Sequence, residues 1–144
     1  MISFTDYRDL DFEYVFFHEN SAFERMTKES FQRLYLEDDL VKIQIILIKE
    51  IIIGYLIIWL DEAKFQLYSI FIQKEFRHQG MAYNALLLLE KQLRKTGVKE
   101  ASLEVNEHNI NAIKLYNKLG YKEVAVRKDY YHNHDNALLM YKKL

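Results

Sequence analysis

The stretch that decides the fold runs from residue 67 to residue 82 and reads Leu67-Tyr-Ser-Ile-Phe-Ile-Gln-Lys-Glu-Phe-Arg-His-Gln-Gly-Met-Ala82. Its first six residues have the pattern of a buried strand, and a long helical pattern begins at Gly80. A strand that leads into a helix N-terminus leaves several backbone N–H groups unpaired, where the helix dipole is positive. Because such a terminus binds anions, the stretch predicts a phosphate-binding loop at residues 77–82.

The residue types of this loop suit a phosphate ligand. Gly80 has no Cβ and lets the backbone approach a phosphate closely. Ala82 keeps the next turn open, while Arg77 and His78 can add positive charge. Ordinary helix starts also carry glycine and arginine, so these residues alone leave a plain helix start as an alternative.

The rest of the chain alternates between strand and helix patterns and predicts an α+β, or mixed α/β, domain with a mostly antiparallel sheet. The helix after the loop carries an apolar stripe at helical spacing, and Gly54 indicates a bulge or a close backbone approach in a strand. The stripe consists of Ala82, Ala85, Leu86, Leu89 and Leu93. We expect strands near 2–4, 41–48, 51–60, 64–72, 99–105, 121–127 and 137–143, and helices near 9–18, 27–35, 80–96 and 109–119.

Composition narrows the class of protein. The 144 residues predict one domain, 1–144, and the balance of 50% apolar and 28% charged residues is that of a globular protein. Cysteine is absent, which excludes disulfides, cysteine-based zinc sites and a thiol nucleophile, and which fits a reducing cytoplasm. The net charge of −1 gives no argument for nucleic-acid binding. The first 40 residues are acidic, which suits a cationic ligand, and the rest are basic, which suits a polyphosphate ligand. Alternatively, this distribution of charge reflects solvated helix faces.

One apolar stretch, residues 43–60, raises the question of a membrane span. Lys49 and Glu50 lie near its middle, where each charge costs about 2.5–3.5 kcal/mol in a bilayer. Two apolar runs joined by a charged dipeptide predict a buried β-hairpin instead. The first residues also lack the pattern of a signal peptide, so we expect a cytoplasmic protein without a membrane partner.

The motif Arg77-x-x-Gly80-x-Ala82 resembles the Q/R-x-x-G-x-G/A signature with which GNAT acetyltransferases grip the pyrophosphate of coenzyme A. From about residue 64 to the end, the chain resembles the bacterial ribosomal-protein-alanine N-acetyltransferases and, more distantly, the eukaryotic N-terminal acetyltransferases. The first 60 residues match only in pattern. The resemblance implies a GNAT fold with about seven strands and four helices, and acetyl-CoA as the acyl donor without a metal. It places the donor against Arg77, His78, Gln79, Gly80, Met81 and Ala82, and against backbone N–H groups of Ile70, Phe71 and Ile72.

A second run carries the resemblance further, from Leu103-Glu104-Val105 through Asn109 to Tyr116 and Leu119-Gly120. In the family, the residues that match Glu104 and Tyr116 are the proposed general base and general acid, and the one that matches Asn109 contacts the cofactor. Without the resemblance, Glu104 is an exposed strand glutamate and Tyr116 a core aromatic residue.

The chemistry of acetyl transfer requires groups of these kinds. A protonated amine cannot attack a thioester, and a free α-amine has a pKa of about 7.7–8.0, so a carboxylate acting directly or through water suffices near neutral pH. The oxyanion needs an N–H donor, and a phenol can protonate the leaving thiolate. No covalent enzyme intermediate is required.

The C-terminal segment supports recognition of a peptide. Tyr130 and Tyr131 resemble the tyrosine pair with which N-terminal acetyltransferases hold a substrate N-terminus, although paired tyrosines in a loop are also common amphipathic surface. His132 and His134 are two potential ligands without a third, so we expect no metal site.

Three positions depart from the ribosomal-protein enzymes, and all are expected where an acceptor would lie. Residues 23–25 read Phe-Glu-Arg in place of Phe-Pro-Trp, His132 replaces a proline after the tyrosine pair, and Phe71 occupies a position that is usually small.

The hypothesis that follows is an acetyl-CoA-dependent N-acetyltransferase acting on the N-terminal α-amine of a protein, such as a small-subunit ribosomal protein. The alternatives are a GNAT enzyme for a small amine or a lysine side chain, and a module that binds acetyl-CoA without turnover. The oligomeric state is open between a monomer and a homodimer.

Overall fold

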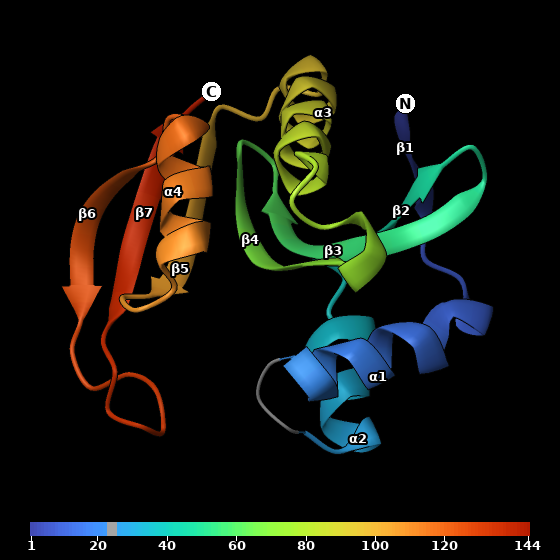
Figure 1. The fold of residues 1–144 in the computed structure, drawn as a ribbon, viewed down its shortest axis with the longest axis horizontal. Helices are drawn as coiled ribbons and strands as arrows, with labels where there is room; N and C mark the ends of the chain where they lie inside the picture. Colours follow the sequence, from blue (N-terminus) through green and yellow to red (C-terminus); the bar gives the residue numbers. More distant parts are fainter. Residues whose placement is uncertain (23–25) are drawn as a thin grey trace.

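The computed structural model describes residues 1–22 and 26–144, which form a seven-stranded sheet with helices on both faces (Figure 1). The strands are β1 (Ile2–Asp6), β2 (Val41–Ile48), β3 (Ile51–Asp61), β4 (Lys64–Ile72), β5 (Glu100–Asn106), β6 (Lys122–Arg127) and β7 (Ala137–Lys143). The helices are α1 (Phe12–Ala22), α2 (Lys28–Phe31), α3 (Met81–Lys95) and α4 (Ile110–Lys118), with short helical turns at Asp9–Asp11, Gln32–Leu36 and Lys74–Phe76.

The strand order across the sheet is β1-β2-β3-β4-β5-β7-β6. Every neighbouring pair is antiparallel except β4 and β5, which α3 connects and which run parallel. A parallel neighbour needs a crossover connection, and α3 supplies it. The mostly antiparallel sheet and the four helices confirm the fold class expected from the sequence.

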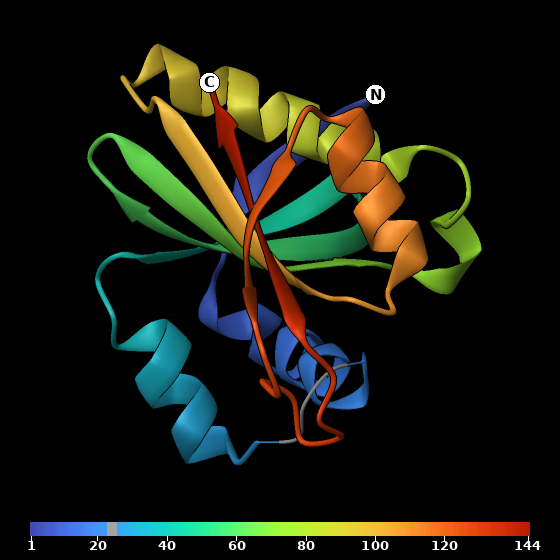
Figure 2. The ribbon, with the colours of Figure 1, turned by 90° about the vertical axis from the view of Figure 1, so that its left-hand side faces the viewer.

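Two apolar cores lie on the two faces of the sheet. Figure 2 shows α3 on one side and α1 and α2 on the other. The first core joins the sheet to the apolar stripe of α3 and to α4, and the second joins β2, β3 and β4 to α1 and α2. Because β3 is covered on both faces over most of its length, it reads as a nearly continuous apolar run in the sequence, whereas β2 and β4 begin with alternating polar and apolar residues.

Most element boundaries match the expectation, and the N-terminal helices differ from it. The helix expected at 9–18 begins only at Phe12, after a short turn, and continues to Ala22. The helix expected at 27–35 consists of one α-helical turn followed by a wider π-helical turn. Phe31, at the end of the α-helical turn, is buried in the second core. Tertiary packing overrides local pattern in these polar segments. The departure noted at positions 23–25 lies outside the described residues.

The apolar stretch at 43–60 forms the hairpin β2–β3. Among residues 1–22 and 26–144, no helix is long and apolar enough to cross a membrane. Gly54 lies in β3, beside a break in the pairing register, and a Cβ there would lie 1.9 Å from the carbonyl oxygen of Phe71. The close backbone approach expected at Gly54 is therefore confirmed.

Candidate active site

The candidate site is a cleft that opens where β4 and β5 part. Their pairing runs only from Lys64↔Glu100 to Leu67↔Leu103, although β4 continues to Ile72 and β5 to Asn106. A cleft of about 890 Å³ lies beyond this point and is lined by both strands, by the start of α3 and by α4.

A β-bulge lies just beyond the last paired residues. Ile58 pairs with Leu67 and Ile57 with Ser69, so Tyr68 is the extra residue of the bulge. Before the bulge, Leu67 packs into the core under α3, whereas after it Ser69 and Phe71 face α1. The bulge therefore inverts which face each residue of β4 occupies, as bulges near active sites commonly do.

The predicted phosphate loop forms one end of the cleft. Gly80 precedes the first residue of α3 with φ of 77°, and His78 has φ of 61°, so two left-handed residues curve the backbone here. The first N–H groups of α3 have no acceptor within the helix and stay available to a ligand. A Cβ at Gly80 would project into open space, 3.9 Å from Asn84 as its nearest neighbour. This concave backbone at a helix N-terminus, left open at Gly80, is of the kind that binds phosphate groups.

Arg77 connects this loop to the end of β4. Its Nε donates a hydrogen bond of 2.7 Å to the carbonyl oxygen of Ile72, and its guanidinium lies 5.4 Å from the ring centroid of Phe71. Arg77 therefore holds the loop against the strand, in addition to the charge it brings to the cleft.

The backbone of β4 beyond the bulge presents donors to the cleft. The N–H of Gln73 donates to the carbonyl oxygen of Ile53 in β3, at 2.7 Å. Since N–H groups alternate in direction along a strand, those of Ile70 and Ile72 point away from β3, on the side of the cleft, and that of Phe71 points toward β3. Ile70 and Ile72 line the cleft, whereas the side chain of Phe71 lines a second pocket against α1.

Glu104 lies on β5 and its side chain, only 16% exposed, faces the cleft from the side opposite the first core. Its carboxylate forms an ion pair of 3.5 Å with Arg127 at the end of β6. The negative charge of Glu104 also affects two tyrosines. The pKa of Tyr68 is raised by burial and by the charges of Asp38 and Glu104, and that of Tyr131 by burial and by Glu104 and Tyr130.

Tyr116 projects from α4 into the same cleft and is buried. Burial, and to a lesser extent the charge of Tyr131, raises the pKa of Tyr116 to about 12. Its phenol therefore keeps its proton at neutral pH, which is the state that a general acid requires. Asn109 caps α4, its side chain accepting a hydrogen bond from the Ala112 N–H, and it also lines the cleft.

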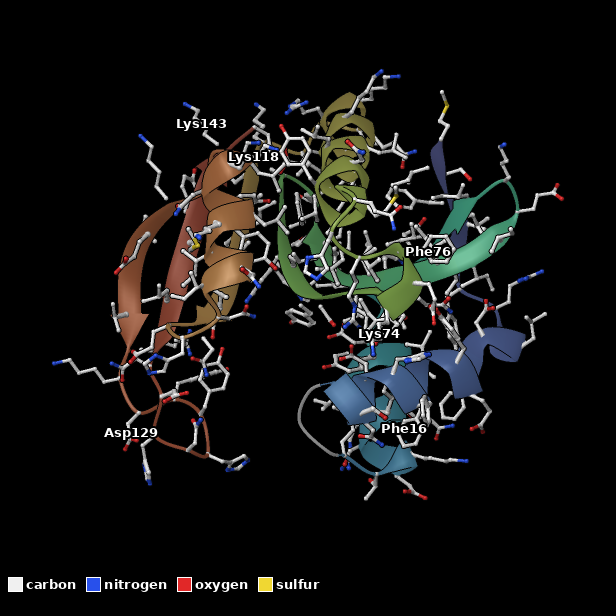
Figure 3. The ribbon with its side chains drawn as sticks, viewed as in Figure 1. Phe16, Lys74, Phe76, Lys118, Asp129 and Lys143 are labelled. Carbon is white, nitrogen blue, oxygen red and sulfur yellow. The ribbon has the colours of Figure 1, made fainter. Side chains whose placement is uncertain are left out.

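The segment between β6 and β7, where Figure 3 labels Asp129, carries the tyrosine pair. Tyr131 lines the cleft, whereas Tyr130 is 51% exposed and has the Arg127 guanidinium 5.7 Å from its ring centroid. The N–H groups of both tyrosines donate to the carbonyl oxygen of Asp135. The Asp135 side chain in turn accepts hydrogen bonds from Asn106 and Asn133, which ties this segment to the end of β5.

The structure thus brings most of the predicted site residues together, and separates three. The cleft is lined by Ile70, Ile72, Arg77, His78, Gly80, Met81, Ala82, Glu104, Asn109, Tyr116 and Tyr131. Phe71, Gln79 and Tyr130 do not line it; the Gln79 side chain instead donates to the backbone carbonyl oxygen of Glu75.

Sequence reasoning missed several residues at the cleft. Tyr68 and Ser69 line it because of the bulge, and neither glycine nor another local signal marks that bulge in the sequence. Lys118 on α4 also lines the cleft and lies toward α3 (Figure 3), with its Nζ 4.4 Å from the ring centroid of Tyr83.

A buried acid behind β4 was also missed. Glu19 on α1 is 4% exposed, and one of its carboxylate oxygens accepts hydrogen bonds of 2.6 Å from Tyr55 and from Ser69. Burial raises the pKa of Glu19, while both hydrogen bonds oppose that rise. A signal for it exists: Glu19 follows the buried Val15 by four residues, which places both on one face of a helix.

His132 and His134 belong to the segment between β6 and β7, where the His134 ring pairs with Asp129. Within the described part of the chain, no group of three or more histidine, aspartate or glutamate side chains is arranged to hold a metal ion.

Comparison with known proteins adds to this geometry. The sequence profile of the acetyltransferase (GNAT) family matches residues 4–121. A ribosomal protein bS18-alanine N-acetyltransferase of Escherichia coli is 38% identical over 84 residues, which cover 56% of this chain and 55% of the relative. A relative from Bacillus subtilis is 30% identical over 133 residues, covering 91% of this chain and 88% of the relative.

The chain spans little more than half the length of the first curated relatives that it matches, 57% and 55%. Among solved structures, the ribosomal-protein-S18-alanine N-acetyltransferase from Escherichia coli superposes with a TM-score of 0.85 at 22% identity. That superposition covers 99% of this chain and 94% of the other, and it is a likeness in fold.

Proposed function

The chain belongs to the acetyltransferase (GNAT) family, and from this premise we propose that it transfers an acetyl group from acetyl-CoA to the N-terminal α-amine of a protein. The relatives named as ribosomal protein bS18-alanine N-acetyltransferases support a small-subunit ribosomal protein as the acceptor.

The observation that carries the proposal is the cleft between β4 and β5. It has backbone N–H donors at the α3 N-terminus, a carboxylate at Glu104 and a buried phenol at Tyr116. An anion site, a base and an acid along one cleft are what transfer from a phosphate-bearing thioester to an amine requires.

On the donor side, we assign the loop at residues 77–82 to the diphosphate. The N–H groups of the first turn of α3 donate to it, Gly80 leaves room for it, and Arg77 and His78 contribute charge. Asn109 lies farther along the cleft, at the start of α4, and contacts the donor there. Acetyl-CoA supplies an activated acetyl group as a thioester.

On the acceptor side, Glu104 takes the proton from the amine, directly or through a water molecule. The N–H groups on the cleft side of β4, at Ile70 and Ile72, stabilise the negative charge that develops on the carbonyl oxygen. Tyr116, protonated because of its raised pKa, gives its proton to the leaving thiolate. Tyr130 and Tyr131 hold the acceptor peptide, and Tyr131 does so at the wall of the cleft.

An assay of CoA thiol release across a panel of acceptors tests this function. The panel contains peptides that begin with alanine or serine, the same peptides blocked at the N-terminus, a polyamine and an aminoglycoside. We expect turnover with the free peptides and none with the blocked ones. Turnover with only the polyamine or aminoglycoside would instead support a small-amine enzyme, and binding of acetyl-CoA without turnover a binding module.

Substitution of the two proposed catalytic residues tests their roles. We expect Glu104→Gln and Tyr116→Phe each to lower kcat by about 10²–10⁴-fold, the usual worth of a positioned acid or base. Binding of acetyl-CoA, measured by titration calorimetry, should change little in either variant. If both variants turn over like the wild type, the assignment is wrong.

A further inference from the structure

Glu19 is a buried acid that the proposed chemistry does not use. It lies on α1, behind β4 as seen from the α3 side of the sheet. Its carboxylate accepts hydrogen bonds from two hydroxyl groups of the sheet, those of Tyr55 in β3 and Ser69 in β4. At 2.6 Å, both are in the short range typical of O–H donors to a charged carboxylate. Burying a carboxylate is costly, so its position here calls for an explanation.

The bond to Ser69 depends on the bulge. Without the extra residue at Tyr68, the alternation of β4 would place Ser69 on the face of Leu67, in the core under α3. With the bulge, Ser69 turns to α1 and reaches Glu19. The hydrogen bond therefore stabilises the bulged conformation of β4 over the regular one, which cannot form it.

The same bulge sets the direction of the next amide. Ile70 follows Ser69, and its N–H lies on the cleft side of β4, away from β3. A regular strand would reverse the direction of each backbone group beyond position 68, and the Ile70 N–H would then point at β3. Because Glu19 fixes the orientation of Ser69, it also fixes the direction of the neighbouring Ile70 N–H.

We propose that Glu19 is a positioning residue for acetyl transfer: by binding Ser69 and Tyr55 it holds the bulge that directs the Ile70 N–H into the cleft. This inference rests on the proposed function, in which that N–H stabilises the oxyanion. Tyr55 fixes the carboxylate itself, and Ser69 transmits its position to β4.

Two variants at Glu19 distinguish the loss of its hydrogen bonds from the loss of its negative charge. Glu19→Ala removes the acceptor of both hydrogen bonds, and we expect kcat to fall by up to about 10²–10³-fold, the usual cost of losing an oxyanion donor. The KM for acetyl-CoA should stay within about twofold, because the loop that binds the diphosphate is untouched. Glu19→Gln retains a carbonyl oxygen that accepts from both hydroxyls, so it should keep most of the activity.

Further variants come from the hydrogen-bond network of Glu19, and a matched control comes from a second buried acid, Glu90. Ser69→Ala breaks the link between Glu19 and β4 and should lower kcat as Glu19→Ala does. Tyr55→Phe removes only the bond that fixes the carboxylate and should lower kcat less. Glu90 on α3 is also fully buried, bonded to Tyr121 and Lys142 on the other side of the sheet. Glu90→Ala should lower the melting temperature as Glu19→Ala does, but leave kcat of the folded protein unchanged.

The amide signal of Ile70 in ¹H–¹⁵N NMR spectra, recorded with CoA bound, gives a readout that needs no acceptor. It should shift in Glu19→Ala and stay in place in Glu19→Gln. If the wild type acetylates no peptide, the proposed function fails and this signal still decides the role of Glu19. An unmoved Ile70 signal in Glu19→Ala, or a loss of activity in Glu19→Gln equal to that in Glu19→Ala, would overturn the inference.

Discussion

At the scale of single residues, burial determines the state in which Tyr116 can act. Its pKa is raised to about 12, first by burial and then by the charge of Tyr131. A phenol with a raised pKa stays protonated up to that pH, so the acid form is present across the range in which an α-amine loses its proton, at about 7.7–8.0.

The pH dependence of turnover follows from the pKa of Tyr116 and the pKa of the acceptor α-amine. With a peptide that begins with alanine, we expect kcat/KM to rise through about pH 8 as the amine deprotonates, and then to stay level to about pH 10. The matched control Tyr141→Phe, which changes a partly exposed phenol on β7 that donates to Glu100, should show the same profile. A decline with a midpoint between pH 9 and 10 would show that Tyr116 is not the acid, or that its pKa is not raised.

At the scale of elements, α3 has a left-handed glycine at each end. Gly80 precedes the helix with φ of 77°, and Gly97 follows it with φ of 97°. An added Cβ meets no close neighbour at either position, so the internal cost of each alanine is the backbone strain of about 1–2 kcal/mol. Only Gly80 lies at the cleft.

This pair makes a controlled test of the phosphate loop. Gly80→Ala and Gly97→Ala should lower the free energy of unfolding by similar amounts in urea denaturation. We expect only Gly80→Ala to weaken acetyl-CoA binding, by about tenfold, since a methyl group there costs at least one hydrogen bond worth about 1.5 kcal/mol to a charged group. Equal affinities for acetyl-CoA in the two variants would exclude the loop as the anion site.

At the scale of the whole molecule, a buried ion pair joins the two halves of the sheet that part at the cleft. Glu90 on α3 is fully buried and binds the Nζ of Lys142 on β7 at 2.6 Å. Lys142 also donates to the carbonyl oxygen of Leu119 at the end of α4, and the Tyr121 hydroxyl donates to Glu90. These contacts connect α3 to the α4–β7 side, where the parallel pairing of β4 and β5 is short.

Removing one partner of this pair should destabilise the protein more than removing both. Lys142→Met leaves the buried Glu90 carboxylate with only the half-exposed Arg94 guanidinium, 3.7 Å away, as a cation. We expect a loss of up to about 3–5 kcal/mol in the free energy of unfolding. Lys142→Met combined with Glu90→Gln should recover part of that loss. Urea denaturation followed by circular dichroism measures both, and a double variant less stable than the single one would contradict this account.

Much of the fold follows from local pattern. The bounds of β2, β4 and β7, the apolar stripe of α3 and the cap of α4 at Asn109 were all predictable, because alternation, helical spacing and capping are properties of neighbouring residues. The strand-to-helix turn that we propose as the phosphate loop was predictable for the same reason, since the strand, Gly80 and the helix that compose it are contiguous in the sequence.

The sequence by itself determined the order of elements, the loop at residues 77–82 and the candidate residues Glu104 and Tyr116. Only the tertiary structure decided that β4 bulges at Tyr68, that Glu19 reaches Ser69 and that Arg127 pairs with Glu104. Each of these contacts joins residues more than 20 positions apart or depends on the register between strands. Local propensity is insensitive to both, because register is set by the packing of a whole sheet between two cores.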